Sequence, residues 1–120
     1  MTYQRRTVLC LLLTLVAGTL HALDSPAKEE IDHLLDAVAK SDARFIRNGK
    51  EYSSQQGANH LRYKQGQAGD RVKTAEDFIQ GICTKSYFSG KPYLMKQKDG
   101  TTTEVGPWLT KLLAEHRQGR

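Results

Sequence analysis

The chain has 120 residues, of which 18 are Lys or Arg and 13 are Asp or Glu, so its formal net charge is +5. This length allows one small domain with a thin core and excludes a large multidomain enzyme. The positive charge is modest and spread along the chain, which does not favour a nucleic-acid-binding protein.

The N-terminus has the pattern of a secretory signal peptide. Arg5 and Arg6 precede an uncharged apolar run, Thr7 to Leu20. This run is shorter than the roughly 20 residues that a membrane-spanning helix needs. A positive start, a short apolar run and small residues after it are typical of a cleaved leader. The alternative is an uncleaved single-pass anchor.

We therefore expect a signal peptide at residues 1–22 and a single α+β domain at residues 23–120. The leader contains two of the 18 basic residues and none of the 13 acidic ones, so the mature chain keeps a net charge of +3. We expect no stable membrane anchor after cleavage. Cys10 leaves with the leader, and Cys83 remains as a single thiol on an apolar stretch, where a buried, inert role is expected.

The first predicted element is a helix. Ser25 and Pro26 suit the N-cap and the first helical position. An apolar stripe at helical spacing follows them, formed by Ile31, Leu34, Leu35 and Val38. The helix should end near Lys40-Ser41, before a hairpin begins.

The hairpin is predicted by the stretch RFIRNGKEYS. Asn48-Gly49 at its centre is the strongest short signal for a two-residue turn. Such a turn places Arg47 opposite Lys50 and Phe45 opposite Tyr52, with all four on one face. Like charges directly opposite each other are destabilising. Either both cationic side chains extend into water, or an anion or an acidic side chain lies between them.

Two further helices follow the hairpin. Ser53 or Ser54 can cap a helix that runs to about Lys64, and residues 66–70 are then a loop. Thr74 can cap the next helix, because acidic residues follow it in the first turn. The inner face of that helix is formed by Phe78, Ile79, Ile82 and Cys83.

A second hairpin and a last helix complete the chain. Residues 92–97 and 101–105 have strand character around a Lys98-Asp99-Gly100 turn. The final helix runs from Trp108 to about Arg117. The predicted fold class is α+β, a small single domain of about four helices with two short β-hairpins.

The residues do not form a recognised catalytic or metal-binding motif. Ser86 or Ser89 with His60 is the one hydrolase arrangement to consider, but there is no nucleophile-elbow sequence around either serine. The histidines of the mature chain have no ligand-like spacing to each other or to Cys83. We predict no catalytic residues, no metal site and no cofactor.

One constellation indicates binding. His60 and Lys64 are four residues apart, so they share a helix face, whereas Arg62 points elsewhere. With Arg47, Asn48 and Lys50 on the preceding hairpin, they predict a basic pocket for a carboxylate, a phosphate or an acidic loop of a partner. The alternative is a solvated surface on which Glu51 or Glu76 pairs with the cations.

Several elements occur in an order that resembles a known family. They are FIRNG (Phe45 to Gly49), HLR (His60 to Arg62) with Lys64, TAEDFI (Thr74 to Ile79) and SGKPY (Ser89 to Tyr93). Together they resemble the YfeK-like family of small secreted envelope proteins of Gram-negative bacteria, which carry a domain of unknown function. The resemblance covers nearly the whole mature chain. It implies a periplasmic α+β domain without an assigned activity, cofactor or partner.

These observations lead to two functional hypotheses. The first is a non-catalytic binding or interaction module of the periplasm, for example an inhibitor or immunity-type partner of an envelope enzyme. Its partner is then an unknown envelope protein or an anionic small ligand. The alternative is a small envelope hydrolase that acts on cell-wall material.

Overall fold

The computed structural model describes residues 25–120, so the predicted signal peptide at residues 1–22 lies outside the described residues. The helices are α2 (Ser25–Lys40), α3 (Ser54–Ala68), α4 (Ala75–Phe78) and α5 (Val105–Gln118), and the strands are β1 (Arg44–Arg47), β2 (Lys50–Tyr52), β3 (Leu94–Lys96) and β4 (Thr102–Glu104). A 3₁₀ turn, η1 (Gly69–Arg71), follows α3, and a π-helical turn, η2 (Ile79–Cys83), continues α4. The α+β prediction and the order of the elements are confirmed.

The two predicted hairpins form a single antiparallel sheet of strand order β2-β1-β3-β4. Asn48 and Gly49 have φ values of 53° and 79°, which is the left-handed geometry that the turn requires. Arg47 therefore lies opposite Lys50 and Phe45 opposite Tyr52, as predicted. The pairing of β1 with β3 joins the hairpins and sets Phe45 beside Met95.

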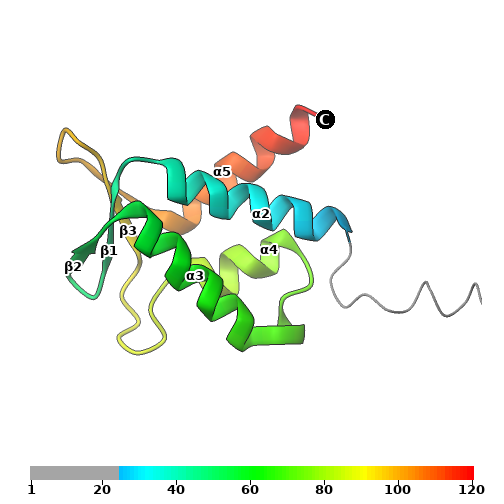
Figure 1. The fold of residues 1–120 in the computed structure, drawn as a ribbon, viewed down its shortest axis with the longest axis horizontal. Helices are drawn as coiled ribbons and strands as arrows, with labels where there is room; N and C mark the ends of the chain where they lie inside the picture. The colour runs from blue at the N-terminus through cyan, green and yellow to red at the C-terminus, as the bar shows by residue number, and fades with distance from the viewer. Residues whose placement is uncertain (1–24) are drawn as a thin grey trace, which may run out of the picture.

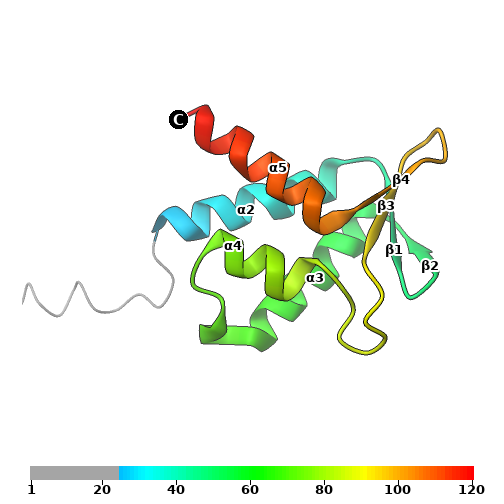
Figure 2. The same cartoon turned by 180° about the vertical axis from the view of Figure 1, so that it is seen from behind.

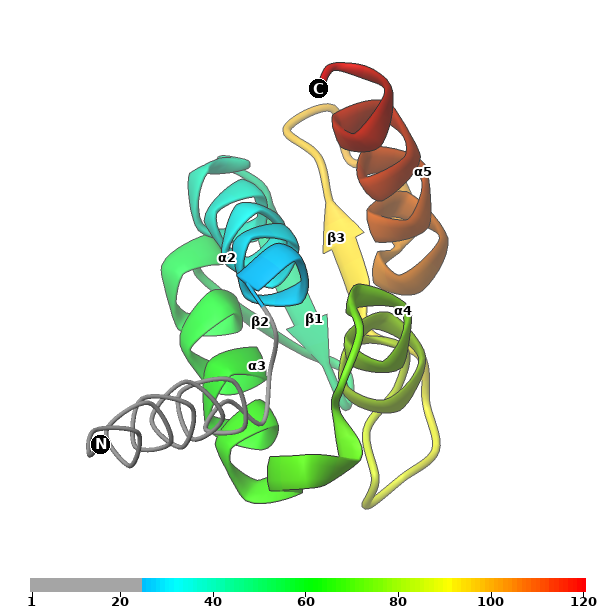
Figure 3. The ribbon, with the colours of Figure 1, turned by 90° about the vertical axis from the view of Figure 1, so that its right-hand side faces the viewer.

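The sheet stands at one end of the molecule, and the helices extend from it (Figure 1). Seen from behind, α5 runs alongside α2, with α4 and α3 below them (Figure 2). A view along the molecule places α2 and α3 on one side and α4 and α5 on the other (Figure 3). The core fills the space between them, and its largest fully buried side chains include Tyr93, Phe45, Phe78, Leu61 and Leu109.

Reciprocal capping boxes begin two of the helices. Ser53 accepts a hydrogen bond from the N–H of Gln56, whose side chain accepts one from the N–H of Ser53. Thr74 and Asp77 make the same pair of contacts at the start of α4. Each box satisfies backbone N–H groups that the first helical turn leaves without partners.

The predicted end of α3 is wrong by one turn. The helix continues past Lys64 to Ala68, so residues 66–68 are helical and not part of a loop. Gly66 costs about 1 kcal/mol of helix propensity, but Ala68 packs against the core and compensates for that local cost. In the part of the chain that the structure describes, no helix has both the length and the apolar character needed to cross a membrane.

Candidate functional site

A cleft of about 410 Å³ lies between α3 and the loop that leads from η2 to β3. We call it the α3 cleft, and its walls are formed by Arg47, His60, Tyr63, Lys64, Gln67, Arg71, Ser86, Tyr87, Phe88 and Tyr93. Four of these residues come from one face of α3, at positions 60, 63, 64 and 67, which is helical i, i+3, i+4, i+7 spacing. Leu61, on the adjoining face, is fully buried in the core. No carboxylate lines the cleft among the described residues.

Lys64 forms the floor of the cleft and is only 5% exposed. Its Nζ donates hydrogen bonds to the carbonyl oxygens of Ile82 and Lys85, at 2.8 and 3.0 Å, and to the hydroxyl of Tyr93 at 2.9 Å. An ammonium group has three protons, so all of them are used. Lys64 was predicted as a direct ligand-binding residue, but its geometry is that of a clamp between α3 and the loop.

The π-helical turn explains why a lysine is needed there. Helix C-termini leave carbonyl groups without intrahelical partners, and side chains take up three of them here. Thr84 Oγ1 donates to the Ile79 carbonyl, Tyr87 Oη to the Gly81 carbonyl, and Lys64 to the Ile82 carbonyl. A cation near a helix C-terminus also complements the helix dipole. Lys64 thus caps η2 from a different helix.

The surroundings of Lys64 shift the titration of two groups. Desolvation by burial lowers the pKa of Lys64 to about 8, and the charge of Arg47 acts in the same direction. Burial raises the pKa of Tyr93 to about 12. The ammonium group lies 4.0 Å from the ring centroid of Tyr87 and 4.7 Å from that of Tyr93. The face of Tyr87 stabilises the charge that desolvation disfavours.

His60 is joined to this network through Tyr93. Its Nε2 lies 3.1 Å from the Tyr93 hydroxyl. Because that hydroxyl accepts a hydrogen bond from Lys64, its own proton is available for His60 Nε2. Desolvation, Arg47 and Lys64 all lower the pKa of His60. The histidine is therefore mainly neutral at pH 7.

Arg47 lies at the sheet end of the cleft and is partly buried. Its guanidinium carbon lies 5.2 Å from the ring centroid of Tyr52, and its Nη2 lies 3.5 Å from the Tyr52 hydroxyl. Glu51 pairs with Arg44 and Lys96, and Glu76 pairs with Arg117. The alternative in which one of these two carboxylates neutralises the predicted pocket is therefore wrong. Arg47 has a planar set of donors suited to a carboxylate or a phosphate.

The two other predicted residues lie outside the cleft. The Lys50 side chain is exposed and does not line the cleft. Asn48 Oδ1 accepts a hydrogen bond from the Ser89 hydroxyl, and that hydroxyl accepts one from the N–H of Lys91 at 3.1 Å. The Asn48-Gly49 turn therefore holds the loop that forms one wall of the cleft. The structure brings Arg47, His60 and Lys64 together, places Asn48 behind them and leaves Lys50 apart.

Sequence reasoning missed the aromatic rim of the cleft. Tyr63, Tyr87 and Phe88 are 65%, 66% and 94% exposed, and they are the exposed large hydrophobic side chains of the described residues. All three line the α3 cleft. The available signal was the pair Tyr87-Phe88 in a short segment of Ser, Gly and Lys, a composition that does not bury aromatic rings.

The geometry does not assemble a serine hydrolase. A serine nucleophile needs a histidine base within hydrogen-bonding distance. The Ser86 side chain accepts a hydrogen bond from the N–H of Ser89, and the Ser89 hydroxyl binds Asn48. The hydrogen bond of His60 goes to Tyr93. Within residues 25–120 no cluster of His, Cys, Asp and Glu is placed to hold a metal ion. Cys83 is fully buried, and burial raises the pKa of its thiol.

Fold and cleft together define a small α+β domain with a basic, aromatic-rimmed cleft. The chain matches a family of unknown function (DUF5329) over residues 25–117, and it belongs to that family. It is similar to the uncharacterized protein YfeK of Salmonella typhimurium strain LT2, with 38% identity over 87 residues, which is 72% of this chain and 71% of that protein. The predicted YfeK-like resemblance is thus confirmed. No solved structure matches the chain.

Proposed function

We propose that this protein is a non-catalytic interaction module that binds an acidic segment of a partner protein in the α3 cleft. One observation carries the proposal. Within residues 25–120, the three exposed large aromatic side chains, Tyr63, Tyr87 and Phe88, rim a single cleft that also presents Arg47 and has no carboxylate in its lining. Aromatic and arginine side chains dominate the energetics of protein interfaces.

The rigidity of the loop supports the same proposal. The N–H of Gly90 donates to the Ser86 carbonyl at 2.9 Å, and the N–H of Ser86 donates to the Lys91 carbonyl at 3.0 Å. Tyr87 and Ser89 are tied to the body of the protein by their hydroxyl groups. Phe88 is therefore held at the tip of a preorganised loop, so little conformational entropy is lost when it is covered.

The cellular location of the module is part of the proposal. A leader at residues 1–22 would export the chain to the periplasm, where an envelope protein would be the partner. An inhibitor or immunity-type role fits a small domain that offers a rigid loop and a charged cleft.

In-cell photo-crosslinking tests this function. A photoreactive phenylalanine analogue replaces Phe88 in the full-length chain, and the same analogue at the exposed Thr103 of β4 is the matched control. We expect one protein adduct from position 88, none from position 103, and loss of the adduct on Arg47→Glu. The captured protein, once purified, should bind the Arg47→Glu variant at least about tenfold more weakly.

Two outcomes would overturn the proposal. One is the same adducts from positions 88 and 103, which would indicate random encounters. The other is an adduct that survives Arg47→Glu with unchanged affinity, because the charge of the cleft would then have no role. Circular dichroism of each variant verifies that it is folded.

A further inference from the structure

The α3 cleft adjoins a further cleft at each of its ends. At the sheet end it adjoins a cleft of about 320 Å³, and both clefts are lined by Arg47 and His60. At the other end it adjoins a cleft of about 390 Å³, and both are lined by Arg71 and Tyr87. We call the three adjoining clefts the α3 groove.

The length of the groove indicates the kind of ligand. From α3 it is lined between Gln56 and Ala68, and twelve residues of α-helix correspond to about 18 Å. An extended peptide advances about 3.3 Å per residue, so about five residues would fill this length. A lone carboxylate or phosphate would occupy only a fraction of the space.

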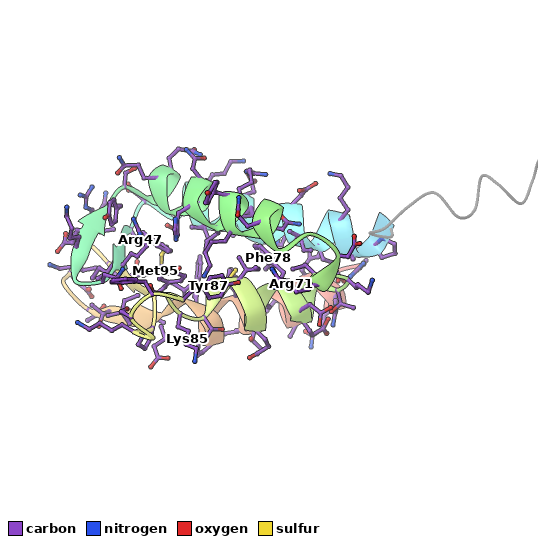
Figure 4. All side chains as sticks on the ribbon, turned by 90° about the horizontal axis from the view of Figure 1, so that it is seen from below. Arg47, Arg71, Phe78, Lys85, Tyr87 and Met95 are labelled. Carbon is purple, nitrogen blue, oxygen red and sulfur yellow. The ribbon has the colours of Figure 1, made fainter. Side chains whose placement is uncertain are left out.

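The charges of the groove are placed towards its two ends. Arg47 lies beside the sheet and Arg71 at the far end, with Tyr87 between them (Figure 4). Arg71 Nε donates to the Ala68 carbonyl at 3.2 Å, which leaves the outer nitrogens of its guanidinium for a ligand. Asp77 also lines the far end, but its carboxylate accepts hydrogen bonds from the N–H groups of Lys73 and Thr74.

The middle of the groove favours an apolar side chain. Tyr63, Tyr87 and Phe88 form its rim. The floor is Lys64, whose three protons are already donated within the protein. It therefore contributes charge but no hydrogen bond to a ligand. Apolar contacts with the rings remain as the main short-range interaction there.

From this arrangement we infer that the α3 groove takes an extended peptide segment with two acidic side chains about four residues apart and an apolar residue between them. This inference rests on the proposed function, because it specifies the partner segment that the cleft would bind. One acidic side chain pairs with Arg47, the other with Arg71, and the apolar residue lies against the aromatic rim.

Two synthetic peptides of identical composition test the spacing. Both are acetylated and amidated heptapeptides, Gly-Asp-Gly-Leu-Gly-Asp-Gly and Gly-Asp-Asp-Leu-Gly-Gly-Gly. Each peptide is titrated calorimetrically into a protein of residues 23–120, which gives both affinities. This protein is obtained by leader processing of the full chain or by expression with the same boundary. We expect the peptide with spaced acids to bind at least about tenfold more tightly, because only it engages both arginines with charge-assisted hydrogen bonds.

Variants assign the two ends of the peptide. Arg47→Gln and Arg71→Gln should each remove the difference between the peptides. Arg62→Gln is the matched control, because Arg62 is an exposed arginine of α3 that lines a different surface. It should change either affinity by less than about twofold. Thermal unfolding of each variant verifies that the fold is kept.

Equal affinities for the two peptides, or a difference that persists in both groove variants, would overturn the inference. A different result would overturn it in favour of a lipid surface. The protein would sediment with phosphatidylglycerol vesicles, the Phe88→Ala variant would not, and neither peptide would bind. The crosslinking experiment is independent of peptide spacing. If a protein adduct forms at position 88 and depends on Arg47, but the two peptides bind equally, the proposed function stands and only the two-acid segment is ruled out.

Discussion

Lys64 is a buried ammonium group whose three hydrogen-bond acceptors are uncharged. Two are backbone carbonyls of η2 and the following loop, and the third is the Tyr93 hydroxyl. A carboxylate partner would stabilise the charged form, but neutral acceptors offset only part of the desolvation cost. That cost lowers the pKa of Lys64 to about 8. Below pH 8 the three hydrogen bonds therefore fix the loop, but the desolvation of the charged form offsets part of the stability that they provide.

The first prediction concerns Lys64→Met. Below pH 8 the variant should be less stable than the native chain by about 1–3 kcal/mol, because the carbonyls of Ile82 and Lys85 and the Tyr93 hydroxyl lose their donor. Urea unfolding monitored by circular dichroism measures the free energy of unfolding. A variant as stable as the native chain would show that the clamp adds nothing to the fold.

The pH dependence of that difference has a definite sign. The pKa of Lys64 is about 8 in the folded chain and 10.5 ordinarily. Between these values the unfolded chain binds more protons, so the native chain gains stability as the pH rises, by about 2 kcal/mol up to pH 10. The raised pKa values of Cys83 and Tyr93 act in the opposite direction. Both groups remain in Lys64→Met, so the difference between the two proteins should widen from pH 8 to pH 10.

The second prediction concerns His60 and Arg47. Desolvation lowers the pKa of His60 most, and the Arg47 guanidinium lowers it further. Arg47→Gln removes that repulsion and should raise the pKa of His60, as measured by NMR titration of the imidazole protons. Arg62→Gln should leave it unchanged, because Arg62 lines a different surface from the cleft. An unaltered His60 pKa in Arg47→Gln would mean that the guanidinium points away from the cleft in solution.

The lowered pKa of His60 also determines how the stability of the protein changes with pH. The pKa of His60 is lower in the folded chain than its ordinary value of 6.5. As the pH falls through 6.5 the unfolded chain takes up the proton first, so stability decreases on acidification. Arg47→Gln should reduce this loss.

At the scale of the elements, α3 and β1 approach each other at a glycine. A Cβ atom on Gly57 would lie within 2.7 Å of three side-chain carbons of Phe45, which is closer than packed atoms can come. Phe45 is itself fully buried and pairs with Tyr52 and Met95 across the sheet. Gly57 therefore lets α3 pack directly on the Phe45 ring of β1, although a glycine weakens the helix.

The third prediction compares Gly57→Ala with Gly66→Ala in the same helix. Gly57→Ala should destabilise the protein by about 1–3 kcal/mol, because overpacking against Phe45 exceeds the gain in helix propensity. Gly66 has no atom within 4 Å of the added Cβ, so Gly66→Ala should stabilise the protein by up to about 1 kcal/mol. Thermal and urea unfolding measure both changes. The same sign for the two variants would contradict the close packing of α3 on β1.

Local signals were sufficient to predict most of the elements. The hairpin register followed from Asn48-Gly49, the α4 cap from Thr74, and the α3 cap was narrowed to Ser53 or Ser54, of which the structure uses Ser53. Each of these features depends on residues only a few positions apart. The pairing of β1 with β3 joins residues about fifty positions apart, and no local pattern encodes it. The last turn of α3 was missed because core packing of Ala68 overrides the local cost of Gly66.

The candidate site was also predictable only where it depends on local spacing. The spacing of His60 and Lys64 predicted that they share a helix face, and the structure places Arg47 in the same cleft. The hydrogen bonds that occupy Lys64 could not be predicted, because its acceptors lie in the π-helical turn, in the loop after it and on Tyr93, and these meet α3 only in the folded chain. The aromatic rim was missed because Tyr87 and Phe88 are brought to α3 by a loop that closes through Lys85 and Pro92.

At the scale of the whole molecule, one ion network joins the first and last helices. Glu30 of α2 is 5% exposed. Arg117 of α5 donates two hydrogen bonds of 2.8 Å to it, and Arg120 also contacts it. Arg117 makes a second pair, with Glu76 of α4, at 2.6 Å. The C-terminal helix is thereby fastened to α2 and α4 at the end of the molecule away from the sheet (Figure 2).

The last prediction concerns Arg117→Met. Glu30 would keep Arg120 but lose its two-pronged partner within a buried site, so the variant should lose about 2–4 kcal/mol at pH 7. Lys28→Met is the control, because it breaks an exposed pair with Asp32, and it should change stability by less than about 0.5 kcal/mol.

The hydrogen bond from Arg117 is the main cause of the lowered pKa of Glu30. The stabilisation it provides is complete above the ordinary pKa of 4.5 and is lost as the pH falls through the lower folded value. Urea unfolding from pH 7 to pH 3 should therefore show a smaller acid loss for Arg117→Met than for the native chain. Parallel curves would mean that another carboxylate governs acid unfolding.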